Sequence, residues 1–158
     1  MRLEASTQIA TTPEAVLAFF GDMEINYTRW HPDHVLFRWE GPAELKVGGA
    51  FYFEERIGGK LLKKRVRFTR IEPDRIEFAL TNPLFRLVLP RIAFVIGPEG
   101  DGVRVVQTIP IRTGPIGAWL NRREFDAVRV HMAEEMQNMK RLLEAGDDPA
   151  LAHPARRP

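Results

Sequence analysis

The chain has 158 residues, of which 44% are hydrophobic and 28% are charged, as expected for a globular protein long enough to bury one substantial core. Its formal net charge of +2 is too small to favour nucleic-acid binding, and the absence of cysteine excludes disulfides, thiolate metal sites and cysteine nucleophiles. No stretch approaches the length of a membrane span and the first residues form no apolar leader, so we expect a cytoplasmic protein with no nucleic-acid or membrane partner.

The N-terminal part predicts a strand, a short helix and an irregular segment. Residues 2–10 alternate between polar and apolar side chains, as strands do. Thr12-Pro13-Glu14 is a typical helix N-terminus, with a capping hydroxyl, a proline at the first helical position and an acid in the first turn. Gly21 is a plausible end for this helix, and residues 22–34 are irregular and rich in aromatic side chains.

A series of predicted strands follows, each ending at turn residues. Gly58-Gly59 is a two-residue hairpin signal, and the basic run 60–67 alternates with apolar residues, which predicts a strand with one solvated face. Several short strands joined by tight turns indicate an antiparallel, strongly curved sheet. The expected strands cover residues 35–40, 50–57, 61–71, 75–80, 85–96 and 103–111.

The last predicted element is a long amphipathic helix. From Ile116 to Leu143 there is no proline and no glycine after Gly117, and apolar residues recur at spacings of three, four and seven. Gly146 ends the helix. Residues 147–158 contain three prolines and no periodicity, so we expect a single domain over residues 1–146 and a disordered tail over 147–158.

The order of these elements predicts an α+β protein. A strand, a short helix, a run of antiparallel strands and one long final helix resemble the helix-grip fold of the Bet v 1-like, or START-type, superfamily. The resemblance covers residues 1–145 and implies a curved antiparallel sheet wrapped around a long C-terminal helix, with a ligand cavity between them. This fold hosts many functions, so function must be argued from particular residues.

Two polar residues interrupt the apolar face of the final helix. His131 and Glu135 continue the steps of three and four that connect Val128 to Met139, which places both on the core side. Burying an imidazole and a carboxylate is unfavourable unless each has a partner. The two side chains lie one turn apart, the spacing with which helices supply two metal ligands. The alternative is a His–Glu pair that is partly exposed and satisfies itself.

The aromatic segment contributes two more histidines. His31 and His34 lie three residues apart, and Pro32 restrains the backbone between them. The alternative is a loop that caps the sheet, with His31 packed between Trp30 and Trp39.

A third polar intrusion occurs in the strand 51–57. Alternation places Glu55 on the same face as Phe51 and Phe53, toward the expected cavity, and leaves Glu54 on the surface, although a β-bulge would exchange the two. Two histidines and two carboxylates suit Zn²⁺, with Mn²⁺ or Fe²⁺ as alternatives. The predicted ligands are His34, Glu55, His131 and Glu135. One cation bound by these four side chains would remove the free-energy cost of burying them.

These motifs together resemble those of the diacetylphloroglucinol and phloretin hydrolases. The likeness lies in Tyr27-x-x-Trp30-His31-Pro32-x-His34, in Glu54-Glu55 followed by Ile57-Gly58-Gly59, and in His131-x-x-x-Glu135. It implies zinc held by two histidines and two glutamates, which fall here on His34, Glu55 (or Glu54), His131 and Glu135. It also implies hydrolysis of a carbon–carbon bond between a ketone and a phenolic ring. This chain is shorter than those hydrolases and has no histidine between His34 and His131, so the metal site carries over better than the substrate.

The sequence therefore favours a metal-dependent hydrolase that acts on a small aromatic ketone, such as an acylated phenol. Tyr27 or His31 would hold a phenolic oxygen, and Glu55 or Glu54 would shuttle a proton. The alternative is a metal-free, cyclase-like or binding protein whose pocket holds an apolar or aromatic molecule. Pairing into a homodimer is a further expectation for this fold. The enzymatic hypothesis requires that His131 and Glu135 face His34 and Glu55 rather than solvent.

Overall fold

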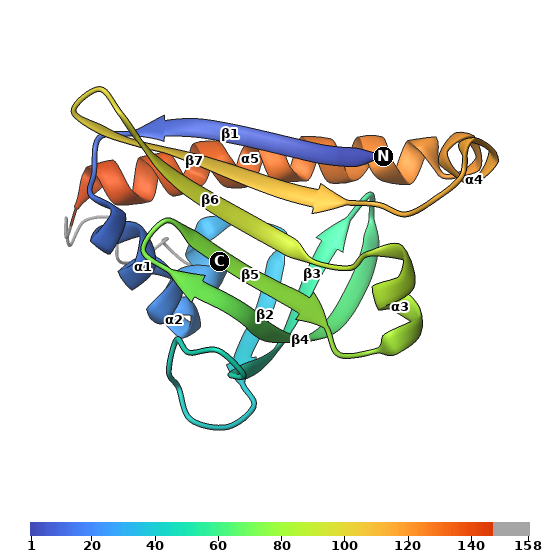
Figure 1. Cartoon of the computed structure of the whole chain (residues 1–158), viewed down its shortest axis with the longest axis horizontal. Helices are drawn as coiled ribbons and strands as arrows, with labels where there is room; N and C mark the ends of the chain where they lie inside the picture. Colours follow the sequence, from blue (N-terminus) through green and yellow to red (C-terminus); the bar gives the residue numbers. More distant parts are fainter. Residues whose placement is uncertain (147–158) are drawn as a thin grey trace, which may run out of the picture.

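In the computed structural model, which describes residues 1–146, seven antiparallel strands form one sheet that curls around the last helix (Figure 1). The strand order is β1-β7-β6-β5-β4-β3-β2, so the first strand of the chain pairs with the last. The strands are β1 (Arg2–Ile9), β2 (His34–Trp39), β3 (Ala50–Ile57), β4 (Lys60–Glu72), β5 (Arg75–Leu80), β6 (Ile92–Glu99) and β7 (Gly102–Pro110). The predicted curved antiparallel sheet is confirmed.

Five helices accompany the sheet in the described part of the chain: α1 (Pro13–Gly21), α2 (Met23–Trp30), α3 (Pro83–Val88), α4 (Pro115–Leu120) and α5 (Arg122–Ala145). The long helix α5 runs along β1 and β7, while α1 and α2 close one end of the sheet (Figure 1). The predicted long C-terminal helix that packs within the curved sheet is thereby confirmed. Among residues 1–146, no helix is both long and apolar enough to cross a membrane. The tail predicted over 147–158 lies outside the described residues.

Local sequence signals explain two of the boundaries. The hydroxyl oxygen of Thr12 accepts a hydrogen bond from the backbone N–H of Ala15 (3.2 Å), and Pro13 occupies the first turn of α1. Gly58 and Gly59 both have positive φ, +57° and +78°, which a two-residue hairpin between β3 and β4 requires. This hairpin fixes the β3–β4 register, so that Glu55 lies opposite Leu62.

The core lies between the concave face of the sheet and the apolar face of α5. Phenylalanine rings from several strands meet the two N-terminal helices there, and methionines of α5 complete the packing. The centre of this core contains Phe20, Phe68, Phe94, Met136 and Met139, each at most 2% exposed.

The structure differs from the sequence expectation in three segments. Residues 22–34, expected to be irregular, contain α2, whose buried Met23, Tyr27 and Trp30 have helical spacing but whose N-terminus lacks a side-chain cap. The strand expected over 85–96 begins only at Ile92, because Asn82 caps the short helix α3 by accepting from the backbone N–H of Leu84 (2.9 Å). The expected single final helix is interrupted at residue 121, between α4 and α5.

Candidate functional site

A cavity of about 950 Å³ lies between the sheet and α5. This volume is at the upper end of the range of about 300–1,000 Å³ that is usual for small-molecule pockets. The wall is mainly apolar and aromatic, and among its residues are Tyr27, Phe53, Phe78, Phe94, Phe125 and Met132. Such a wall suits a ligand that is itself largely apolar and contains a ring.

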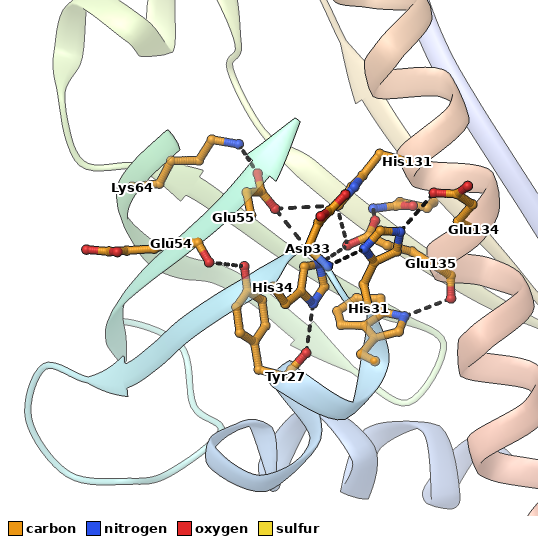
Figure 2. A network of polar contacts seen from close by, with 12 residues as sticks. Tyr27, His31, Asp33, His34, Glu54, Glu55, Lys64, His131, Glu134 and Glu135 are labelled. Carbon is orange, nitrogen blue, oxygen red and sulfur yellow. Dashed lines mark hydrogen bonds and ion pairs between the residues drawn. The ribbon is translucent and has the colours of Figure 1, made fainter. Parts of the chain in front are cut away.

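Four buried titratable side chains meet between the sheet and α5 (Figure 2), and three of them, Glu55, His131 and Glu135, line the cavity. His34 begins β2, Glu55 lies on β3, and His131 and Glu135 lie one turn apart on α5. All four are between 4% and 6% exposed, and one potential ligand atom from each lies within 4.8 Å of those of the other three. His34 is opposite Glu55 in the β2–β3 register, so strand pairing brings two of them together and the helix brings the others.

The tautomer of His34 follows from its contacts. Its Nδ1 lies 2.8 Å from the carbonyl oxygen of Tyr27, and because a carbonyl only accepts, this nitrogen carries the hydrogen. A neutral His34 then presents a lone pair at Nε2, which lies 3.0 Å from Oε1 of Glu135. Two acceptors at this distance require a proton between them or a cation beside both atoms. The ring stacks flat on that of Tyr27, with centroids 4.0 Å apart, which fixes its orientation.

Glu135 carries a negative charge in this environment. Burial raises its pKa, but the hydrogen bond and charge of His34, the charge of His131 and the hydrogen bond from Gln107 outweigh burial and hold the pKa below its usual value. The amide of Gln107 donates to Oε2 of Glu135 (2.8 Å). The indole of Trp30 donates to the backbone carbonyl of Glu135 (2.8 Å), which ties α2 to this turn of α5.

His131 contributes a buried nitrogen that has no hydrogen-bond partner among the described residues, namely Nε2. This atom lies 3.7 Å from Oε2 of Glu55 and 3.8 Å from Oε1 of Glu135. Burial lowers the pKa of the imidazole, although the two carboxylates oppose this. An unpaired buried polar atom costs about 1–3 kcal/mol unless something binds it.

Glu55 is held between a lysine and the two histidines. Its Oε1 accepts an ion-paired hydrogen bond from Lys64, while Oε2 faces His131 and lies 4.0 Å from Nε2 of His34. Atoms that bind Zn²⁺ tetrahedrally at about 2.0–2.2 Å lie about 3.3 Å from one another. The four histidine-to-glutamate separations in this cluster, 3.0–4.0 Å, bracket that value, and all the potential ligand atoms lie within 4.8 Å of one another. Two imidazole nitrogens and two carboxylate oxygens are a ligand set that could hold a divalent cation.

The structure places the other predicted site residues around this cluster. Tyr27 lines the cavity; its hydroxyl donates to the backbone carbonyl of Glu54 (3.3 Å), and burial together with the nearby carboxylates raises its pKa, so the phenol stays protonated. His31 is buried beside His131, with ring centroids 4.1 Å apart, and donates from Nε2 to Glu134 (3.0 Å). It therefore does not pack between Trp30 and Trp39 as the alternative interpretation expected.

The choice between Glu54 and Glu55 follows from the strand register. The β3–β4 pairing is uninterrupted, and the bulge in this region falls on β2, between His34 and Leu36. Glu54 consequently points to the opposite face of β3 from Glu55, where it accepts from the hydroxyl of Tyr52 (2.5 Å). Neither Glu54 nor His31 lines the large cavity.

Sequence reasoning missed two residues of the site, Lys64 and Gln107. Lys64 belongs to the basic run predicted to form a strand with one solvated face, and it was not singled out, yet it shares a strand face with the buried Val66 and Phe68. Gln107 follows Val103 and Val105 at alternate positions of β7, as Glu55 follows Phe51 and Phe53 on β3. The same alternation rule would have identified both as polar residues that point inward.

Comparisons with known proteins agree on the fold. The sequence profile of a family described as polyketide cyclase / dehydrase and lipid transport matches residues 1–144. No curated protein sequence matches the chain. Protein TTHA0849 from Thermus thermophilus is 17% identical, with a TM-score of 0.71, over 94% of this chain and all of its own. Protein Ms6760 from Mycobacterium smegmatis is 15% identical, with a TM-score of 0.67, over 91% of each chain.

A plant protein of the Bet v 1-like type is also similar. Ginseng major latex-like protein 151 from Panax ginseng is 16% identical, with a TM-score of 0.57, over 84% of this chain and 97% of its own. Identities this low show a shared Bet v 1-like fold, and the function must be argued from the site.

Proposed function

This chain belongs to the polyketide cyclase / dehydrase and lipid transport family, and from this premise we propose that its pocket binds a small, largely apolar, ring-containing molecule. The aromatic wall and the volume of about 950 Å³ support this part of the proposal. Lys64, Glu55, His131 and Glu135 give the pocket one polar side, which would orient a carbonyl or phenolic oxygen of the ligand, and His34 lies behind them.

The finer part of the proposal is that the cluster holds a divalent cation, Zn²⁺ in the first instance, with Mn²⁺ or Fe²⁺ as alternatives. The observation that carries it is the convergence of four buried ligand atoms within 4.8 Å, one of which, Nε2 of His131, has no other partner among residues 1–146. When bound, such a cation polarises a ketone oxygen and lowers the pKa of a water molecule toward neutrality.

The reaction we propose is hydrolysis of the carbon–carbon bond between the acyl group and the ring of an acylated phenol. Water supplies a hydroxyl group to the acyl carbon, the bond to the ring breaks, and the ring carbon takes a proton, which yields a carboxylic acid and a phenol. The aromatic wall would hold the ring and exclude bulk water, and the protonated hydroxyl of Tyr27 would donate to a phenolic oxygen. If a carboxylate shuttles the proton, it would be Glu55 rather than Glu54, because Glu54 faces away from the cavity.

A metal-free function is the second candidate, and the family match favours it over the hydrolase. The contacts of His34 with Glu135, Gln107 with Glu135, and Lys64 with Glu55 satisfy much of the cluster without an ion. In this version a proton on His34 balances Glu135, and the protein binds or cyclises an apolar molecule.

Metal analysis separates the two candidates. The protein is purified without chelator, its metal content is measured by elemental analysis, and Co²⁺ is then added to metal-free protein to observe its visible absorption. The proposal expects one divalent ion per chain and a tetrahedral cobalt spectrum, both lost in Glu135→Gln. The matched control is Glu134→Gln, which alters the neighbouring glutamate of the same helix, whose side chain is 56% exposed. Metal-free protein with no cobalt spectrum would leave only the binding function.

Substrate class requires a separate assay. Acylated phloroglucinols are incubated with metal-loaded protein, and release of the carboxylic acid is followed. Binding of the same compounds to metal-free protein is measured by calorimetry. Turnover that disappears in His131→Ala, with binding retained, supports the hydrolase, whereas binding without turnover in loaded protein supports the second candidate.

A further inference from the structure

Two short helices leave a group of large apolar side chains on the surface. We call this group the α3/α4 patch, and its members are each between 61% and 76% exposed: Leu84, Phe85 and Leu87 of α3, and Ile116, Trp119 and Leu120 of α4. The backbone N–H of Arg112 donates to the carbonyl of Val88 (2.8 Å), so the segments that carry the two helices are tied together. Figure 1 shows α3 and α4 at the same end of the molecule, away from α1 and α2.

The α3/α4 patch has a basic border. Residues 82–91 and 111–123 contain no aspartate or glutamate, in a chain whose formal net charge is only +2. Of the arginines in these two segments, Arg91 lies 4.0 Å from the carboxylate of Glu77, and the remaining ones form no ion pair among residues 1–146. The guanidinium of Arg122 lies over the ring of Trp119, 5.8 Å from its centroid. The five exposed arginines of this border are Arg86, Arg91, Arg112, Arg122 and Arg123.

The patch is continuous with the ligand pocket. Phe85 is 61% exposed and also lines the cavity, as do Leu89, just after α3, and Phe125, in the first turn of α5. Large apolar side chains in contact with water are unfavourable in proportion to their exposed area, and patches of this kind mark interaction sites. An apolar molecule could pass from a surface bound at this patch into the cavity without crossing bulk water.

We propose that the α3/α4 patch docks the protein onto the surface of an anionic lipid bilayer. Apolar side chains between arginines are the pattern that binds at a membrane interface, where arginine is attracted to anionic headgroups. A second copy of the chain docked face to face would bring five arginines against five, which is repulsive. The inference does not depend on the metal. It departs from the sequence-based expectation of no membrane partner, which was drawn from the lack of a segment long enough to span a membrane.

Vesicle binding of the full chain tests the proposal. Sedimentation with phosphatidylcholine vesicles containing about 30% phosphatidylglycerol, at roughly 0.05 M and 0.5 M NaCl, is compared with pure phosphatidylcholine. The apolar variant is Leu84→Ser, Leu87→Ser, Trp119→Ser and Leu120→Ser combined, none of which lines the cavity. The matched control is Ile25→Ser with Val47→Ser, two positions that are equally exposed (63% and 61%) and lie outside the patch. Circular dichroism confirms that each variant is folded.

The wild type is expected to bind the anionic vesicles at low salt, more weakly at high salt and weakest to the neutral vesicles. The apolar variant should lose at least about tenfold in partitioning, from the apolar area removed. Arg122→Gln with Arg123→Gln should lose roughly fivefold per arginine at low salt, and the control should bind like the wild type.

Three results would overturn the proposal. The first is a wild type that does not bind anionic vesicles, and the second is an apolar variant that binds them as well as the control does. The third is a dimer, seen by light scattering in the wild type and absent from the apolar variant, without vesicle binding. That last result would assign the patch to a second copy of the chain.

Discussion

Replacing Glu135 by glutamine should change stability differently with and without zinc. In metal-free protein the amide can satisfy both present partners, since its oxygen accepts from Gln107 and its NH₂ donates to the lone pair of His34. We therefore expect the free energy of unfolding in a chelator to change by no more than about 1 kcal/mol. With zinc, the same substitution removes a charged ligand from a buried site and should abolish the stabilisation that the ion provides.

The magnitude follows from linkage. Zinc at about one hundred times its dissociation constant stabilises a folded protein by about 2.7 kcal/mol if it binds only that state. For a chain of 158 residues this corresponds to a rise in Tm of about 5–11 °C. The wild type and Glu134→Gln should show this rise, and Glu135→Gln should not. Thermal unfolding followed by circular dichroism at pH 7.5, with EDTA or with zinc, gives all six values.

Two outcomes would refute the reasoning. If zinc raises the Tm of Glu135→Gln as much as that of the wild type, the ion binds elsewhere on the chain. If zinc has no effect on the wild type and Glu135→Gln loses about 3 kcal/mol or more in EDTA, the cluster is a buried His34–Glu135 ion pair and the metal-free function stands.

Three other changes probe the same region. Lys64→Met should weaken zinc binding about 10–100-fold in a chelator-competition titration, because Glu55 loses the partner that orients it, whereas Lys64→Arg should retain most of the affinity. Zinc affinity should be constant around pH 7 and decline only below pH 6.5, the usual pKa of histidine, because burial lowers the pKa of His131 and binding requires the neutral ring. A decline that begins above pH 7 would contradict this prediction. Met136→Ala, at a fully buried core position directly after Glu135, should cost about 2–5 kcal/mol in urea unfolding while the zinc stoichiometry stays unchanged.

The parts of the site that follow from local periodicity could be predicted from sequence. Alternation along β3 places Glu55 inward, and helical spacing places His131 and Glu135 on the core side of α5; both expectations match the burial seen in the structure. These patterns depend only on the geometry of one element, so they need no knowledge of its neighbours. Their role as metal ligands remains a prediction.

The features that depend on neighbours were not predictable in the same way. Whether His31 or His34 joins the cluster depends on the end of α2 at Trp30 and on the pairing of His34 with Glu55. Neither the end of this helix nor this strand register has a strong sequence signal. The ion pair of Lys64 with Glu55 depends on the β3–β4 register. The strand expected over 85–96 begins late because a capped proline turn forms α3, where local chemistry overrides a run of apolar residues.

The pairing of β1 with β7 has a consequence for how the protein comes into being. The N-terminal amino group of Met1 donates to the carbonyl of Ile111 (3.0 Å), a residue 110 positions away, and every pair of this ladder joins the first strand of the chain to the last. During translation, β1 therefore emerges from the ribosome long before its partner strand exists. β1 cannot pair, nor can α5 bring His131 and Glu135 to His34, until synthesis is almost complete, so a nascent chain stalled before residue 110 should be as sensitive to protease as an unfolded one.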